Sequence, residues 1–142
     1  MPYPPAVVQP MREELTRLGF RELTTAEDVD RAVAQAQDPM LLVVNSICGC
    51  AAGVARPGVA RSLQSPDAPR NLATVFAGQD VEATARARSY FEGYPPSSPQ
   101  IAILGKGRLL FMLQRHEIEG RTPEQIAAAL AVAYQKLAAP AA

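Results

Sequence analysis

The sequence has no excess charge of either sign and no long hydrophobic run. Its 14 Lys and Arg residues balance its 14 Asp and Glu residues, so we expect neither nucleic acid nor an anionic membrane as a partner. The apolar runs at 40–44 and 109–113 have strand length, and no apolar run is long enough to span a bilayer. The first residues, Met-Pro-Tyr-Pro-Pro, lack the basic segment and apolar core of a secretory signal. We therefore expect a cytoplasmic protein.

Cysteine is also scarce, with only Cys48 and Cys50 in the chain. A single pair two positions apart cannot form a disulfide framework, and a bridge between them would close too small a loop to stabilise the fold. Cysteines in a reducing cytoplasm are more often catalytic or metal-binding than structural. A zinc site needs about four ligands, and His116 is the only histidine. We therefore predict no metal site and give redox chemistry priority.

What is present fits one α/β domain over residues 1–142. We predict a helical extension at 1–38, followed by a core at 39–138 with the order β-α-β-α-β-β-α. Strands separated by helices favour parallel pairs, and the Gly-Lys-Gly-Arg turn at 105–108 adds an antiparallel hairpin. The predicted fold is thioredoxin-like, with a central mixed β-sheet flanked by helices. Other α/β folds share this element order.

Capping residues and apolar runs place the individual elements. Thr25 and Thr122 are the predicted N-caps of the second and last helices. The run at 40–45 suits a strand that is buried on both faces. Pro57-Gly58 predicts a kink or a second short segment in the helix that follows the cysteines. The predicted helices cover residues 10–18, 25–36, 51–63, 81–91 and a segment from 122 onward, and the predicted strands cover 40–45, 72–76, 101–104 and 109–113.

Cys48 lies between the first buried strand and the next helix. Functional sites in open α/β sheets form beyond the carboxyl ends of the parallel strands. The unpaired amides and the dipole at a helix start stabilise a thiolate, so we expect the pKa of Cys48 to lie below the usual value of about 8.5. Cys50 should be more shielded and have a higher pKa. We predict that Cys48 is the nucleophile and Cys50 the resolving thiol.

The two-residue spacing limits how these thiols can pair. Residues i and i+2 of a helix point about 200° apart, so a Cys48–Cys50 disulfide needs non-helical backbone, which Gly49 can supply. Strain in that bond would make it easily reduced. Such a pair suits removal of a mixed disulfide from a client better than storage of a stable disulfide. A pair of buried, inert cysteines is the alternative interpretation.

Two further segments are expected near the cysteines. Ser98-Pro99 directly precedes the strand at 101–104, which we expect to run antiparallel to the strand at 40–45. A cis-Pro99 would there expose backbone groups that could pair with an extended client. The segment after the strand at 109–113 brings Arg115 and His116 to the same side. His116 could stabilise the thiolate or simply be a surface residue, and Arg115 could pair with a carboxylate on a small thiol or be solvated.

Three segments resemble the bacilliredoxin family. They are the stretch from Val44 to Gly58, which reads VNSICGCAAGVARPG, then YPPSSP at 94–99 and RHEIEG at 115–120. The Cys-Gly-Cys context is long and specific, and the likeness covers essentially the whole chain.

This resemblance implies a thioredoxin-like fold and removal of bacillithiol from S-bacillithiolated proteins. It also implies Cys48 as the attacking thiolate, Cys50 as the resolving residue and Pro99 as a cis-proline. Bacillithiol would be the thiol substrate, no cofactor would be tightly bound, and the partners would be S-bacillithiolated or disulfide-containing client proteins. A general protein disulfide isomerase or reductase is the alternative function, followed by a non-catalytic binding module.

Overall fold

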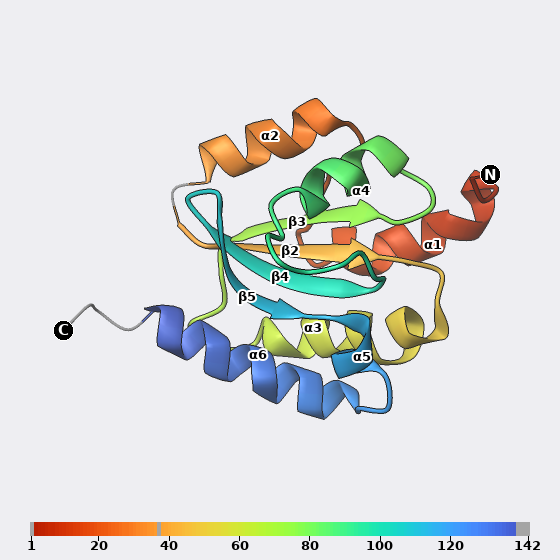
Figure 1. Cartoon of the computed structure of the whole chain (residues 1–142). Coiled ribbons are helices and arrows are strands. Elements are labelled where there is room, and N and C mark those ends of the chain that lie inside the picture. Colours follow the sequence, from red (N-terminus) through yellow and green to blue (C-terminus); the bar gives the residue numbers. More distant parts are fainter. Residues whose placement is uncertain (1, 37, 139–142) are drawn as a thin grey trace.

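The computed structural model describes residues 2–36 and 38–138, and it shows one five-stranded sheet between two layers of helices (Figure 1). The remaining residues of the predicted 1–142 domain lie outside the described part. The strand order is β1-β3-β2-β4-β5. The strands are β1 (Arg21–Glu22), β2 (Met40–Asn45), β3 (Asn71–Phe76), β4 (Gln100–Gly105) and β5 (Arg108–Leu113).

The sheet is mixed, as the element order predicts. Strand β3 lies parallel to both β1 and β2, whereas β4 runs antiparallel to β2 and to β5. The expected antiparallel pairing of β4 with β2 is therefore confirmed. Each predicted strand is found within one residue of its predicted bounds.

The central strand β2 is buried along its whole length, which explains its continuous apolar sequence. Side chains alternate between the two faces of a strand. Leu42 and Val44 accordingly join one apolar cluster, and Leu41 and Val43 join the other. A strand that contributes to two cores carries apolar residues on both faces, and the one polar residue of β2, Asn45, is its last.

The helices divide between the two faces (Figure 1). The first cluster contains side chains of α2 and α4, and the second contains side chains of α1, α3 and α6. The last helix begins as predicted, because the Thr122 and Gln125 side chains bond to each other's backbone amides. The helices are α1 (Pro5–Thr16), α2 (Ala26–Gln35), α3 (Arg56–Ser62), α4 (Val81–Arg88), α5 (Arg115–Ile118) and α6 (Pro123–Ala138).

The N-terminal segment is more than the helical extension predicted for residues 1–38. Its strand β1 pairs with β3, and Arg21 lies opposite Ala73. The segment thereby adds an edge strand to the sheet. Helix α1 also begins at Pro5, five residues before the predicted start, and it includes Pro10. Its first turns are held by Val8, which is buried in the core.

Two other elements differ from the prediction. Helix α4 ends at Arg88 rather than at residue 91, because the chain then tightens into i→i−3 bonds, from the Tyr90 amide to Ala87 and from the Phe91 amide to Arg88. Helix α5, at Arg115–Ile118, was not predicted, since four residues are too few to show a helical periodicity.

The helix after the cysteines has the predicted irregularity, but it lies before the Pro57-Gly58 pair. Residues Ala51–Ala55 form a π-helical turn, η1, and α3 begins at Arg56. The Arg56 amide bonds to the carbonyl of Ala51, five residues back. Pro57 has no amide hydrogen and its ring crowds the carbonyl four residues back. The wider turn accommodates it.

Gly58 of α3 packs directly against α6. A Cβ atom placed on Gly58 would lie 2.7 Å from both Cβ and Cγ2 of Ile126, a fully buried residue. Gly58→Ala should therefore lower the free energy of unfolding by about 1–3 kcal/mol in urea denaturation, because the two helices must separate.

Gly53→Ala is the matched control for this prediction. Gly53 lies in η1, and apart from its own helix and neighbours no atom lies within 4 Å of the position that a Cβ would take there. Alanine should there be neutral or stabilise by up to about 1 kcal/mol. Equal stability of the Gly58→Ala variant and the unaltered chain would contradict the close packing of α3 on α6.

Candidate active site

Cys48 occupies the start of the helix that follows β2. Gly49 and Cys50 are the first two helical residues. The Cys48 carbonyl accepts hydrogen bonds from the amides of Ala51 and Ala52, at 3.0 and 3.1 Å. Its Sγ accepts one from the Cys50 amide, at 3.4 Å. The sulfur of Cys48 therefore satisfies one of the free amides at a helix start, which is the role of an N-cap oxygen.

A buried arginine holds the loop between β2 and Cys48. The Arg56 guanidinium donates from Nη1 to Oδ1 of Asn45 and to the carbonyl of Ser46, both at 2.9 Å. The Oε1 atom of Glu14 lies 3.2 Å from its Nε. Ser46 in turn accepts a hydrogen bond from the Cys48 amide through Oγ, at 3.1 Å. Arg56 therefore pairs with Glu14 and also fixes the cysteine loop.

Strand register brings the other two segments to the same edge of the sheet. Gln100 of β4 lies opposite Val44 of β2, so the residue before it, Pro99, lies level with the end of β2. Pro99 is buried and its peptide bond to Ser98 is cis, as the resemblance implied. Gln114, just after β5, bonds to the Gln100 side chain at 2.6 Å. Helix α5 begins there.

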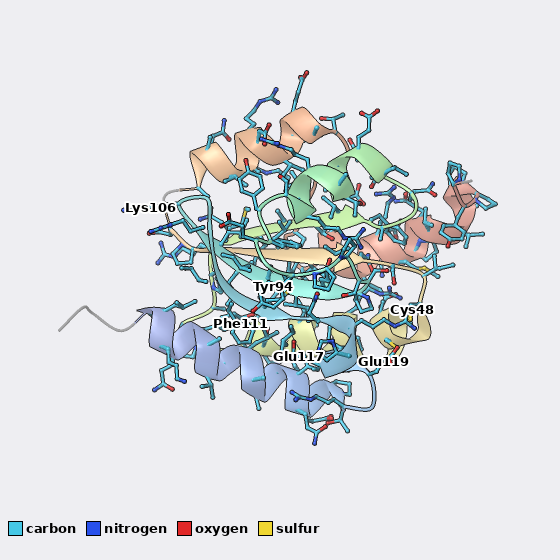
Figure 2. The ribbon with its side chains drawn as sticks, viewed as in Figure 1. Cys48, Tyr94, Lys106, Phe111, Glu117 and Glu119 are labelled. Atoms are coloured by element: carbon cyan, nitrogen blue, oxygen red, sulfur yellow. The ribbon has the colours of Figure 1, made fainter. Side chains whose placement is uncertain are left out.

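Helix α5 and the residue directly after it contribute two charged side chains to the site. Arg115 and Glu119 form an ion pair one turn apart. Glu119 Oε1 accepts a hydrogen bond from Cys50 Sγ at 3.5 Å. Arg115 also donates from Nη1 to the Ser98 carbonyl, at 3.5 Å. The pair therefore connects Cys50 to the proline loop, and Figure 2 shows Cys48 and Glu119 at the same end of the molecule.

The surroundings of Cys48 favour its thiolate. Burial opposes ionisation, but the backbone amide and thiol of Cys50, the Arg115 charge and the Ala51 amide together outweigh it. They hold the pKa of Cys48 below its ordinary value. The lowered pKa agrees with the sequence-based expectation, and the arginine adds a stabilising charge to the amides at the helix start.

Cys50 shows the opposite behaviour. Burial, its hydrogen bond to Cys48 and its hydrogen bond to Glu119 raise the pKa of Cys50 to about 11. The Cys48 sulfur is therefore the more readily ionised of the two, and Cys50 keeps its proton at neutral pH. This difference matches the predicted division into a nucleophile and a resolving thiol. The catalytic roles themselves stay predictions.

The predicted supporting residues Gly49, Ser98 and His116 differ in their contacts with the site. Gly49 is helical with both thiols free, so its predicted role in a Cys48–Cys50 disulfide stays a prediction. Ser98 contributes its carbonyl to the Arg115 contact. His116 is exposed on α5, and within residues 2–36 and 38–138 no side-chain hydrogen bond joins it to either cysteine. Arg115 rather than His116 contributes the positive charge that favours the thiolate.

Sequence reasoning missed Glu119. Within the resembling segment at 115–120, one available signal was its spacing of four residues from Arg115, which would place both on one face of a helix. That signal was unreadable because α5 itself was not predicted. The contact between Cys50 and Glu119 joins residues 69 positions apart, a distance over which sequence periodicity carries no information.

Clusters of metal ligands and membrane-spanning helices are two further kinds of functional feature. In the described part of the chain, no three His, Cys, Asp or Glu side chains lie close enough together to hold a metal ion. None of the helices described combines the length and apolar character needed to cross a membrane.

Comparison with known proteins agrees with this geometry. A family model described as disulphide isomerase matches residues 3–138. A bacilliredoxin of Koribacter versatilis is 53% identical over 134 residues, which cover 94% of this chain and 92% of the relative. The chain belongs to the bacilliredoxin family. A Bacillus anthracis bacilliredoxin is 55% identical over 87% of this chain and 85% of its own length.

The family and the fold agree. A solved chain described as having a thioredoxin fold superimposes with a TM-score of 0.62 at 14% identity, covering 79% of this chain and 90% of the other. The predicted thioredoxin-like fold is therefore confirmed. Membership of the bacilliredoxin family supports a thiol–disulfide oxidoreductase at the level of reaction class.

Proposed function

We propose that this chain removes bacillithiol from S-bacillithiolated client proteins, with Cys48 as the attacking thiolate and Cys50 as the resolving thiol. The observation that carries the proposal is the difference between the two sulfurs. Cys48 Sγ accepts an amide hydrogen bond at a helix start, whereas Cys50 Sγ donates to Glu119. Only a thiolate attacks a disulfide efficiently. The bacilliredoxin name of the relatives supplies bacillithiol as the substrate thiol.

The reaction has two exchange steps. In the first, the Cys48 thiolate attacks the bacillithiol sulfur of the mixed disulfide, and the client sulfur leaves as a thiolate that takes a proton from water. Cys48 then carries bacillithiol. In the second, Cys50 loses its proton to water and attacks Cys48 Sγ, so that bacillithiol leaves as a thiolate. The products are free bacillithiol and a Cys48–Cys50 disulfide, which an external dithiol or thiol must reduce. No tightly bound cofactor is needed.

The test measures which small thiol the protein accepts. A Cys50→Ser variant, which cannot resolve, is mixed with one client protein carrying either bacillithiol or glutathione on the same cysteine. Intact-mass spectrometry should show the mass of bacillithiol added to Cys48, at least about tenfold faster than that of glutathione. Absence of the bacillithiol adduct, or equal rates for both thiols, would refute the substrate assignment.

The description of the family model as disulphide isomerase favours a second candidate, exchange between protein cysteines. Recovery of scrambled ribonuclease without any small thiol would support it. A non-catalytic binding module would instead bind its partner equally well after both cysteines are replaced by serine. Action in the cytoplasm, where thiols are kept reduced, stays a prediction.

A further inference from the structure

Glu119 is the charged group in direct contact with the resolving thiol. Its Oε1 lies 3.5 Å from Cys50 Sγ, and its carboxylate is fixed by the ion pair with Arg115. Arg115 is in turn held by the Ser98 carbonyl. The proposed two-step reaction gives Glu119 no role. Its carboxylate nevertheless contacts Cys50 Sγ, a reacting atom of the second step.

We propose that Glu119 slows the resolving step. By accepting the thiol hydrogen of Cys50 and holding a negative charge beside it, Glu119 delays the attack of Cys50 on a disulfide carried by Cys48. The proposal rests on the proposed thiol exchange at Cys48 and deepens it. While Glu119 holds the thiol hydrogen of Cys50, the adduct on Cys48 persists. A second small thiol can then remove it before the Cys48–Cys50 disulfide forms.

A carboxylate beside a thiol could in principle act as its general base instead. Glu119 is unsuited to that role, because its hydrogen bond to Arg115, followed by the one from Cys50, lowers the pKa of its carboxyl group. A base works well when its pKa approaches that of the group it deprotonates, and the pKa of Cys50 is raised to about 11. The ion pair therefore makes Glu119 a poor proton acceptor while it keeps the negative charge in place.

Arg115 and Cys48 are the other charged or titratable groups that act on Cys50. Arg115 affects both sulfurs. Its charge favours the Cys48 thiolate, and its ion pair holds the Glu119 carboxylate that contacts Cys50. The Arg115–Glu119 ion pair therefore has opposite effects on the ionisation of two cysteines that are only two residues apart.

The experiment uses 5,5′-dithiobis(2-nitrobenzoate) as a disulfide substrate that needs no client. Attack by Cys48 releases one yellow thiolate and leaves the other half on Cys48, and attack by Cys50 then releases the second. The two phases are followed by stopped-flow absorbance from pH 6 to pH 10. Glu119→Gln keeps a hydrogen-bond acceptor but removes the charge.

The second phase of Glu119→Gln should be at least about threefold faster at pH 7. Each unit by which the pKa of Cys50 falls gives tenfold more thiolate, offset by about threefold lower nucleophilicity. The pH profile of this phase should also move to lower pH, which a purely structural role would not cause. A slower second phase would make Glu119 a base, and an unchanged one would leave it without a role in resolution. Either result overturns the proposal.

Glu117→Gln is the matched control. Glu117 lies on the same short helix, and its side chain accepts a hydrogen bond from the Gln114 amide at 3.0 Å in a capping box that glutamine can also form. The substitution therefore removes one negative charge from α5 and keeps the helix cap. Its second phase should match that of the unaltered chain. Failure of the proposed function would appear separately, as a first phase no faster than that of an ordinary thiol.

Discussion

Replacing Cys48 by serine should lower the rate of thiol–disulfide exchange at least about 1,000-fold. A serine hydroxyl is not ionised near neutral pH and cannot replace a thiolate as the nucleophile. Cys50→Ser should keep the first step and lose only resolution, and it therefore serves as the matched control. The measurement is the release of client thiol from a mixed disulfide. Loss of the first step in Cys50→Ser, with Cys48→Ser still active, would reverse the assigned roles.

The pH dependence of the same reaction follows from the sign of the pKa shift. Because the pKa of Cys48 lies below its ordinary value, the first-step rate should rise with pH and level off at a lower pH than for an unperturbed cysteine. Arg115→Gln removes one of the groups that favour the thiolate, so its profile should move to higher pH. A profile that is unchanged by this substitution would remove Arg115 from the groups that stabilise the thiolate.

Arg56→Met should lower the free energy of unfolding by about 2–4 kcal/mol. The side chain of Arg56 is only 3% exposed, and its two hydrogen bonds go to Asn45 and Ser46, which are also buried. Methionine fills a similar length but leaves the Ser46 carbonyl without its donor. A buried acceptor left unpaired costs about 1–3 kcal/mol, and a hydrogen bond to a charged group is worth about 1.5–3 kcal/mol. Urea denaturation measures the loss.

Arg61→Met on the same helix is the comparison for this effect. Arg61 is 58% exposed and pairs with the similarly exposed Glu124, and such surface pairs contribute less than about 1 kcal/mol. The Arg56 variant should also react more slowly at Cys48, because Ser46 no longer fixes the Cys48 amide. An Arg56→Met variant as stable as Arg61→Met would show that the buried guanidinium does not hold the loop.

The features that sequence reasoning predicted are those set by local chemistry. The run at 40–45 has no polar residue before Asn45, so a strand buried on both faces was readable from it, and β2 has those bounds. The Thr122 cap and the 105–108 turn were readable for the same reason. The place of Cys48 between a strand and a helix followed directly from these elements.

The features that were missed or misplaced depend on contacts between distant parts of the chain. Strand β1 has two residues, too few for an alternating pattern, and it exists because β3 lies beside it. Helix α1 starts at Pro5 and buries Val8 in its first turns, which depends on packing in the folded chain. The position of the π-helical turn depends on how the chain accommodates Pro57 while Gly58 packs on Ile126.

The amino-acid sequence alone therefore determined the family, the order of the main elements and the two sulfurs to which we assign the chemistry. The tertiary structure decided how those sulfurs differ. It placed Arg115 and Glu119 beside residues far away in the chain, and it put Arg56 beneath the loop. Electrostatic effects on a thiol depend on distances of a few ångströms, and only the folded chain sets those distances.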